Sequence, residues 1–171
     1  MQTDRSLWKR TAESIAAIKR RFAGELRVGA GTVLSSEQLA MERDAGGEFM
    51  VAPNFSPALI RECVALDMAP IPGALTPTEV VDAWDAGASF VKVFPAGRMG
   101  PDYVKALRAP LAHIPLLAVG GVTVDNAADF IRAGCAGVAV SGALTSREMI
   151  AAGQWDRIAD VARALVEGTR P

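Results

Sequence analysis

The lysine at position 92 is the residue of this sequence best placed to do chemistry. It lies in the apolar run Phe90-Val91-Lys92-Val93-Phe94, whereas the other three lysines lie outside such runs. Alternation along a strand puts Phe90, Lys92 and Phe94 on one face, so we expect the amine between two aromatic rings. Burial without a partner lowers the pKa of an ammonium and frees the amine for Schiff-base chemistry. An ion-paired lysine, or one that reaches solvent at a strand end, is the alternative interpretation.

Two glycine-rich turns and one threonine are candidates for binding an anionic substrate. The segments Val119-Gly120-Gly121-Val122 and Val140-Ser141-Gly142-Ala143 follow the last two predicted strands. Glycine N–H groups beside a helix N-terminus bind anions, and barrels often bind phosphate after their last two strands. Tight turns alone would also explain these glycines. The hydroxyl of Thr32 could hold a carboxylate or keto oxygen, unless Thr32 is an ordinary β-branched strand residue.

The composition excludes several classes of partner and site. Lys and Arg total 18 and Asp and Glu total 19 among 171 residues, so no basic surface for nucleic acid or anionic membrane is expected. No apolar run approaches the roughly 20 residues of a membrane-spanning helix. One histidine, His113, and two cysteines are too few for a histidine-rich zinc site. We therefore expect no metal site. Two cysteines form no disulfide framework, which favours a reduced, cytoplasmic setting. We expect no cofactor.

Six short apolar runs, bounded by Gly or Pro, recur about every 22 residues and predict strands. The runs are 27–33, 49–54, 69–75, 90–96, 115–122 and 137–144. Between them, Ser56-Pro57 and Thr76-Pro77 predict helix starts, because a capping hydroxyl precedes proline at the first helical position. Further helices are predicted over 13–22 and 155–166. Glycines predict the ends of helices at Gly46, Gly87, Gly134 and Gly153.

This alternation predicts an α/β protein with a parallel sheet, formed by one domain over residues 1–171. A doubly wound open sheet and a (β/α) barrel both fit the order of elements. Gly29-Ala30-Gly31 is followed by Thr32-Val33 rather than by a helix, which disfavours a dinucleotide-binding turn. The even spacing of the strands favours the barrel.

Several motifs together resemble the class I 2-keto-3-deoxy-6-phosphogluconate/4-hydroxy-2-oxoglutarate aldolases. The related 2-keto-3-deoxy-6-phosphogalactonate aldolases match about as well, and the resemblance runs from Glu13 to the C-terminus. It implies a (β/α)8 TIM barrel, commonly a homo-trimer, that splits a phosphorylated keto sugar acid into pyruvate and glyceraldehyde 3-phosphate. The motifs are Val28-Gly29-Ala30-Gly31-Thr32-Val33, Pro72-Gly73, Val91-Lys92-Val93-Phe94-Pro95-Ala96, Gly100-Pro101 with Lys105-Ala106-Leu107, and Val119-Gly120-Gly121-Val122.

The resemblance also implies roles for individual residues. Lys92 matches the Schiff-base lysine, and Thr32 matches a residue that contacts the pyruvate moiety. Pro72 and Phe94 match positions that line the pocket. The phosphate site matches Gly120, Gly121 and the Ser141-Gly142 turn, where the family usually has Gly-Ser. The swap keeps the backbone donors but moves the hydroxyl by one position.

The resemblance departs from the family at the start of the chain. In the family, two strands precede the helix that matches 13–22, and the second strand carries a Glu acid/base. Counting back from Ser14, that position falls on Thr3, and residues 1–10 are polar. We therefore expect six parallel strands, with the first two strands and the Glu missing and residues 1–12 outside the resemblance. Imine formation with pyruvate is then expected, with much reduced cleavage.

Two other functions fit the sequence. A non-catalytic remnant that serves only in assembly is one alternative, because unpaired strand edges at 27–33 and 137–144 would favour self-association. Another phosphate-binding barrel enzyme, similar to thiamine-phosphate synthases or epimerases, is the second. Such an enzyme shares the Gly-Gly turn but does not require Lys92.

Overall fold

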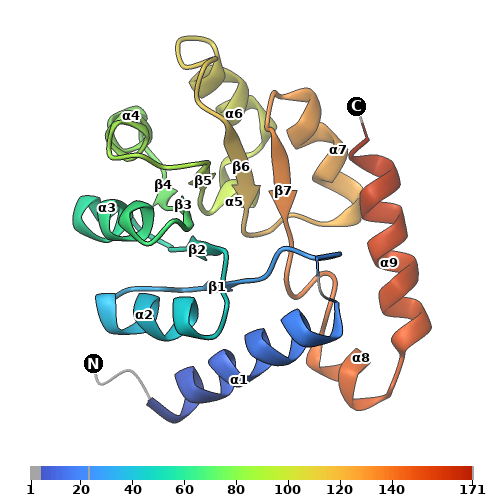
Figure 1. The fold of residues 1–171 in the computed structure, drawn as a ribbon. Helices are drawn as coiled ribbons and strands as arrows, with labels where there is room; N and C mark the ends of the chain where they lie inside the picture. Colours follow the sequence, from blue (N-terminus) through green and yellow to red (C-terminus); the bar gives the residue numbers. More distant parts are fainter. Residues whose placement is uncertain (1–4, 23, 171) are drawn as a thin grey trace. The chain divides into compact units, whose positions relative to one another are not determined.

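A computed structural model describes residues 5–22 and 24–170 and shows strands alternating with helices (Figure 1). The chain divides into two compact units, Met1–Val91 and Lys92–Pro171, and each is described by itself. That the whole chain forms one domain stays a prediction.

The first unit is built on a parallel sheet. Its strands β1, β2 and β3 pair in that order, and the register aligns Gly31 with Val51 and Val51 with Ile71. The strands span β1 Gly29–Gly31, β2 Phe49–Val51, β3 Ala69–Ile71 and β4 Gly73–Ala74. The helices span α1 Arg5–Arg21, α2 Ser36–Asp44, α3 Pro57–Ala65 and α4 Pro77–Asp85. Successive helices pack side by side, since α1 contacts α2, α2 contacts α3 and α3 contacts α4.

Local signals place the ends of these elements. Ser56 caps α3, and Thr76 forms a capping box with Glu79 at the start of α4, as predicted. The predicted strand 69–75 is split into β3 and β4 at Pro72, because proline has no N–H to continue a ladder. Gly46 and Gly87 follow α2 and α4 with φ of +90° and +104°, the left-handed conformation that ends a helix.

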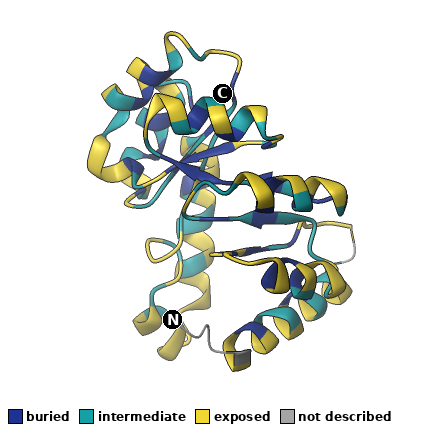
Figure 2. Ribbon diagram, turned by 90° about the vertical axis from the view of Figure 1, so that its left-hand side faces the viewer, coloured by how far each residue is buried: buried dark blue, intermediate teal, exposed yellow. Residues whose placement is uncertain are grey.

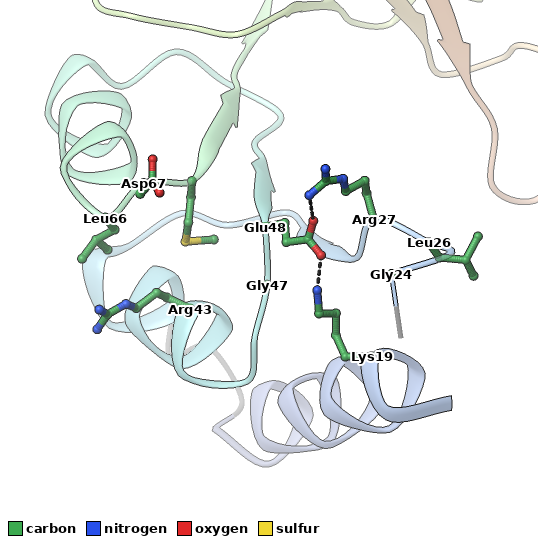
Figure 3. A pocket seen from close by; sticks show the side chains of 10 residues that line it. Lys19, Gly24, Leu26, Arg27, Arg43, Gly47, Glu48, Leu66 and Asp67 are labelled. Atoms are coloured by element: carbon green, nitrogen blue, oxygen red, sulfur yellow. Dashed lines mark hydrogen bonds and ion pairs between the residues drawn. The ribbon is translucent and has the colours of Figure 1, made fainter. Parts of the chain in front are cut away.

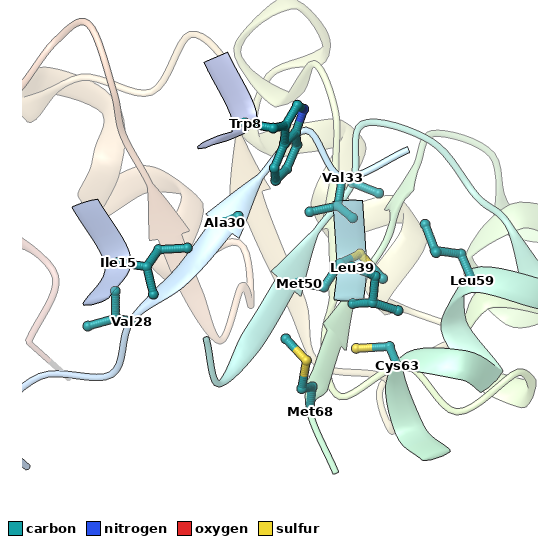
Figure 4. Packing of buried hydrophobic residues seen from close by; sticks show 11 residues of the cluster. Trp8, Ile15, Val28, Ala30, Val33, Leu39, Met50, Leu59, Cys63 and Met68 are labelled. Atoms are coloured by element: carbon teal, nitrogen blue, oxygen red, sulfur yellow. The ribbon is translucent and has the colours of Figure 1, made fainter. Parts of the chain in front are cut away.

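Helix α1 begins earlier than predicted, at Arg5, and covers one side of the core of the first unit. Trp8 and Ile15 lie seven residues apart, so both point to the same face of the helix, and they are 9% and 3% exposed. They pack with Val33, Leu39 and other apolar residues from β1, α2, β2 and α3 (Figure 4). The buried indole of Trp8 explains why the polar stretch before residue 13 is helical.

The second unit contains the remaining strands and helices, and β5 begins at Val91, the last residue of the first unit. Strands β5, β6 and β7 are neighbours in that order, and β6 and β7 are parallel with Val119 opposite Ala139. The strands span β5 Val91–Val93, β6 Leu116–Val119 and β7 Gly137–Ala139. The helices span α5 Ala96–Met99, α6 Pro101–Arg108, α7 Val124–Arg132, α8 Arg147–Ala151 and α9 Trp155–Gly168.

Burial follows the amphipathic pattern of the sequence in each unit. Strand residues and the inner faces of the helices are buried, whereas the outer helical faces are exposed (Figure 2). Val91 and Val93 of β5 are fully buried, as expected for side chains that pack beneath helices. None of the helices described in residues 5–22 and 24–170 is long and apolar enough to cross a membrane.

Candidate active site

Lys92 is the central residue of β5, with buried valines on both sides. Its side chain is only 8% exposed, and burial lowers the pKa of the ammonium. Within residues 92–170, no carboxylate forms an ion pair with Lys92. Its Nζ instead lies 4.5 Å from the centre of the Phe94 ring. The structure therefore presents a buried amine beside the Phe94 ring.

Phe94 lies just beyond the end of β5, in the turn that leads to α5. The predicted strand 90–96 is longer than the observed one, which ends at Val93, and the Phe94–Pro95 peptide is cis. The Phe94 ring extends from Lys92 to the turn after β6. A Cβ atom on Gly120 would lie 2.7 Å from this ring, so only glycine fits there beside Phe94. The phosphate-turn candidate and the lysine thus share one aromatic contact.

The turn Gly120-Gly121 connects β6 to α7. Both glycines have positive φ, +84° and +78°, which disfavours other residues. The Gly97 N–H donates a 2.7 Å hydrogen bond to the Gly120 carbonyl. Asn126 donates from Nδ2 to the Gly121 carbonyl at 3.1 Å and accepts the Thr123 N–H at Oδ1, at 2.9 Å. Gly121 is exposed and precedes the N-terminus of α7, so the turn can receive an anion.

Ser141 and Gly142 lie in the turn after β7 and are exposed. Because Val119 pairs with Ala139, this turn and Gly120-Gly121 follow neighbouring parallel strands at the same edge of the sheet. The Ser141 carbonyl accepts the N–H groups of Leu144 and Thr145 within its own turn, both at 2.9 Å. The two turns predicted to bind phosphate are therefore neighbours in the second unit.

In the first unit, the sheet places Thr32 and Pro72 at one edge. Each comes one residue after the aligned row Gly31, Val51 and Ile71. Thr32 is exposed and has φ +66°, which is strained for a β-branched residue and is found mainly at functional sites. Pro72 is buried. Thr3, the position matched to the acid/base, lies outside the described residues.

Sequence reasoning missed two buried polar residues that support the Thr32 turn. The Gln38 Oε1 accepts the Leu34 N–H at 2.7 Å, and the Glu42 Oε1 accepts the Ala30 N–H. Both side chains come from α2 and hold the chain on either side of Thr32. Burial raises the pKa of Glu42 to about 7. Their separation by four residues on one helical face could have identified them as a pair.

Asn126 and Gly97 were also missed, although the sequence holds a signal for the first. Thr123 and Asn126 are three residues apart after Gly-Gly, which is the spacing of a capping box. Gly97 has no comparable signal, because its role depends on a contact with a turn more than 20 residues away.

A hollow of about 480 Å³ lies at the other end of the strands of the first unit (Figure 3). Glu48 occupies its centre and forms ion pairs with Lys19 and Arg27, which hold the pKa of this carboxylate below its usual value. Lys19 and Arg27 are therefore already paired with Glu48. Neither of the two offers an unpaired charge to a ligand in the hollow. Among residues 5–22 and 24–170, no cluster of His, Cys, Asp or Glu could hold a metal ion.

The chain is similar to known proteins in sequence and in fold. The 2-dehydro-3-deoxy-6-phosphogalactonate aldolase of Escherichia coli (strain K12) is 40% identical over 160 residues, 92% of this chain and 76% of that protein. A probable 2-dehydro-3-deoxy-6-phosphogalactonate aldolase of Rhizobium meliloti (strain 1021) is 45% identical over 119 residues, 69% of this chain and 56% of that protein. A solved structure described as native KDPGal superposes with a TM-score of 0.83 at 40% identity, over 91% of this chain and 74% of that one.

The structural match and the parallel α/β order confirm the expected fold class, that of the aldolase TIM barrels. The family model for KDPG and KHG aldolase matches residues 6–161, and so includes residues 6–12, which the motifs had left out. The buried strand lysine, its aromatic neighbour and the paired glycine turns lie inside this match. The chain belongs to the KDPG and KHG aldolase family.

Proposed function

We propose that this chain acts as a Schiff-base aldolase on 2-keto-3-deoxy-6-phospho sugar acids, with Lys92 as the reacting amine. The observation that carries the proposal is the Lys92 side chain itself, which is buried, lacks an ion-pair partner in its unit and has a lowered pKa. An amine in this state reaches its neutral, nucleophilic form at lower pH than an exposed lysine.

The proposed reaction begins when the Lys92 amine attacks the C2 ketone of the substrate. Loss of water gives an iminium, which withdraws electrons from the neighbouring carbons. A base removes the proton of the C4 hydroxyl, and the C3–C4 bond breaks. C4 leaves as the carbon of an aldehyde, and the electron pair of the broken bond moves toward the iminium to form an enamine. Protonation at C3 and hydrolysis then release pyruvate and return the free amine.

The other site residues would bind the two ends of the substrate. Gly120 and Gly121, with Ser141 and Gly142, offer backbone donors to the phosphate at one sheet edge. Thr32 would contact the pyruvate end, and Pro72 and Phe94 would line the pocket, as the resemblance implies. Glyceraldehyde 3-phosphate and pyruvate are the proposed products.

We also propose a homo-oligomer, a trimer by resemblance to the family, in a reduced cytoplasmic setting. Two buried free cysteines support the reduced setting, because neither is exposed for a disulfide. Light scattering coupled to size-exclusion chromatography measures the oligomeric state, and a monodisperse monomer would contradict the trimer.

Borohydride trapping with pyruvate tests the role of Lys92. Sodium borohydride reduces an imine to a stable amine, so the wild type should carry one pyruvate adduct, located on Lys92 by peptide mass spectrometry. Lys92→Ala should carry none. Lys105→Ala is the matched control, since Lys105 is exposed on α6, and it should be labelled like the wild type.

Aldol cleavage is then assayed with the gluconate and galactonate epimers, by coupling pyruvate release to lactate dehydrogenase. Pyruvate should be released from at least one epimer, and Lys92→Ala should abolish the release. Cleavage that survives Lys92→Ala, or an adduct on another lysine, would overturn the proposal.

A further inference from the structure

We infer that Asn126 and Gly97 are positioning residues that orient the phosphate-binding turn by holding its two carbonyl groups. The inference rests on the proposed function, in which the substrate phosphate lies at Gly120-Gly121. To that proposed site the inference adds Gly97 and Asn126, which lie outside the turn. Their hydrogen bonds orient the turn so that its N–H groups face the phosphate.

The geometry of the peptide bond connects these carbonyls to the donors. A trans peptide is planar, and its C=O and the N–H of the next residue point in opposite directions. The direction of the Gly120 carbonyl therefore sets that of the Gly121 N–H, and the Gly121 carbonyl sets that of the Val122 N–H. Neither N–H donates a hydrogen bond within the described part of the chain, so neither donor is already occupied.

Both carbonyls are held by hydrogen bonds on the side away from these donors. The Gly97 N–H binds the Gly120 carbonyl at 2.7 Å, and the Asn126 Nδ2 binds the Gly121 carbonyl at 3.1 Å. Glycines at positive φ are otherwise free to rotate, so these two bonds restrict a turn that its own residues leave flexible. Pre-organised donors bind an anion without first losing this freedom.

Asn126 has a second hydrogen bond that an experiment must separate from the first. Its Oδ1 accepts the Thr123 N–H at 2.9 Å and so caps α7. Aspartate at this position would keep that acceptor but could not donate to the Gly121 carbonyl. Alanine would lose both bonds. The pair of variants therefore distinguishes support of the turn from support of the helix.

Gly97 also packs closely against the Gly120-Gly121 turn. A Cβ atom on Gly97 would lie 2.6 Å from the Gly121 carbonyl oxygen, in steric overlap. Its own φ is outside the left-handed region, so Gly97→Ala should act through this overlap rather than through backbone strain. The side chain would push the Gly121 peptide away from the orientation that Asn126 holds.

The test compares the concentrations of two ligands that give half-maximal borohydride trapping. One ligand is the phosphorylated keto sugar acid that the wild type accepts, and the other is pyruvate, which has no phosphate. Trapping reports imine formation at Lys92, and intact-protein mass spectrometry separates the adduct of the uncleaved phosphorylated ligand from that of pyruvate released by cleavage. The variants are Asn126→Asp, Asn126→Ala and Gly97→Ala. The control is Ser56→Ala, which removes the N-cap of α3 in the first unit and leaves the turn untouched.

We expect all three variants to raise the half-saturating concentration of the phosphorylated ligand by about tenfold, as for loss of one hydrogen bond in a binding site. The value for pyruvate should not change, and Ser56→Ala should match the wild type for both ligands. Asn126→Asp should also keep the thermal midpoint of the wild type, because it keeps the cap of α7.

Three results would overturn the inference. If Asn126→Asp binds the phosphorylated ligand as well as the wild type does, Asn126 is only a helix cap. If Asn126→Ala binds this ligand as well as the wild type does, any loss in the aspartate variant comes from its negative charge. A loss in Ser56→Ala as large as in the others would indicate general destabilisation. If the wild type itself traps pyruvate but binds phosphorylated and unphosphorylated ligands equally, the proposed phosphate site fails instead.

Discussion

Two opposite influences act on the ammonium of Lys92. Burial disfavours the charged form and lowers its pKa, whereas the Phe94 ring, 4.5 Å from Nζ, attracts a cation through its π face. The ring therefore opposes part of the decrease in the pKa of Lys92 that burial causes. Phe94 thus has a predicted electrostatic role in addition to lining the pocket.

Phe94→Leu should move the pH midpoint of imine formation to lower pH, by up to about one unit. The reason is that loss of the π face removes a stabilisation of the ammonium of about 1 kcal/mol. The measurement is the initial rate of borohydride-trapped pyruvate adduct as a function of pH. Phe94→Tyr keeps the aromatic face and serves as the control. A midpoint that stays in place or moves upward in the leucine variant would contradict this role.

At the scale of the elements, short strands depend on close approach of their backbones. Gly29 in β1 pairs with Phe49 in β2, and a Cβ atom on Gly29 would overlap the Phe49 carbonyl oxygen and ring. Gly31, two residues further along the same strand, has open space where its Cβ would lie. The two glycines of the Gly-Ala-Gly-Thr motif therefore have different structural requirements.

Gly29→Ala should lower the free energy of unfolding by about 2–3 kcal/mol, because the added methyl forces β1 away from β2. Gly31→Ala is the matched control in the same strand and should change stability by less than about 1 kcal/mol. Urea unfolding followed by circular dichroism measures both variants. Equal losses would show that the contact with Phe49 does not limit the strand.

At the scale of the whole molecule, one buried carboxyl couples stability to pH. Glu42 is 1% exposed, and burial raises its pKa from 4.5 to about 7. Its Oε2 has no hydrogen-bond partner among the described residues, nor does the Nε2 of Gln38, also on α2. Cys63 is fully buried, and its thiol has a pKa raised to about 12 by burial and by the Glu42 charge. The protonated form of Glu42 therefore suits the folded core.

The sign of this coupling follows from the raised pKa. Between pH 4.5 and 7 the folded chain holds a proton that the unfolded chain has released, so the stability that the protonated carboxyl contributes is lost as pH rises through this window. The loss amounts to about 3 kcal/mol at neutral pH and above.

Glu42→Gln should remove this pH dependence and make the chain more stable than the wild type above pH 7. Glutamine keeps an acceptor for the Ala30 N–H and carries no charge. Urea midpoints from pH 5 to pH 8 measure the effect, with Glu167→Gln on the exposed face of α9 as the control. Parallel pH profiles for wild type and Glu42→Gln would refute the assignment.

The sequence by itself determined the order of elements and singled out Lys92 as the proposed reacting residue, because both depend on neighbours in the chain. Alternating Gly-bounded runs and capping pairs such as Thr76-Pro77 set strands and helix starts locally, and strand alternation separated Lys92 from the valines beside it. The same rules gave strands that were too long, because proline and paired glycines end a ladder that hydrophobicity alone would continue.

Only the tertiary structure decided how that chemistry is held in place. The contact of Phe94 with Gly120, the hydrogen bond from Gly97 to Gly120 and the burial of Glu42 against β1 all join residues at least 12 positions apart. Local propensity carries no information on such contacts, since they arise when separate elements pack. Packing, rather than any sequence motif, therefore determines that the Gly120 carbonyl is hydrogen-bonded and that the Glu42 carboxyl is buried away from water.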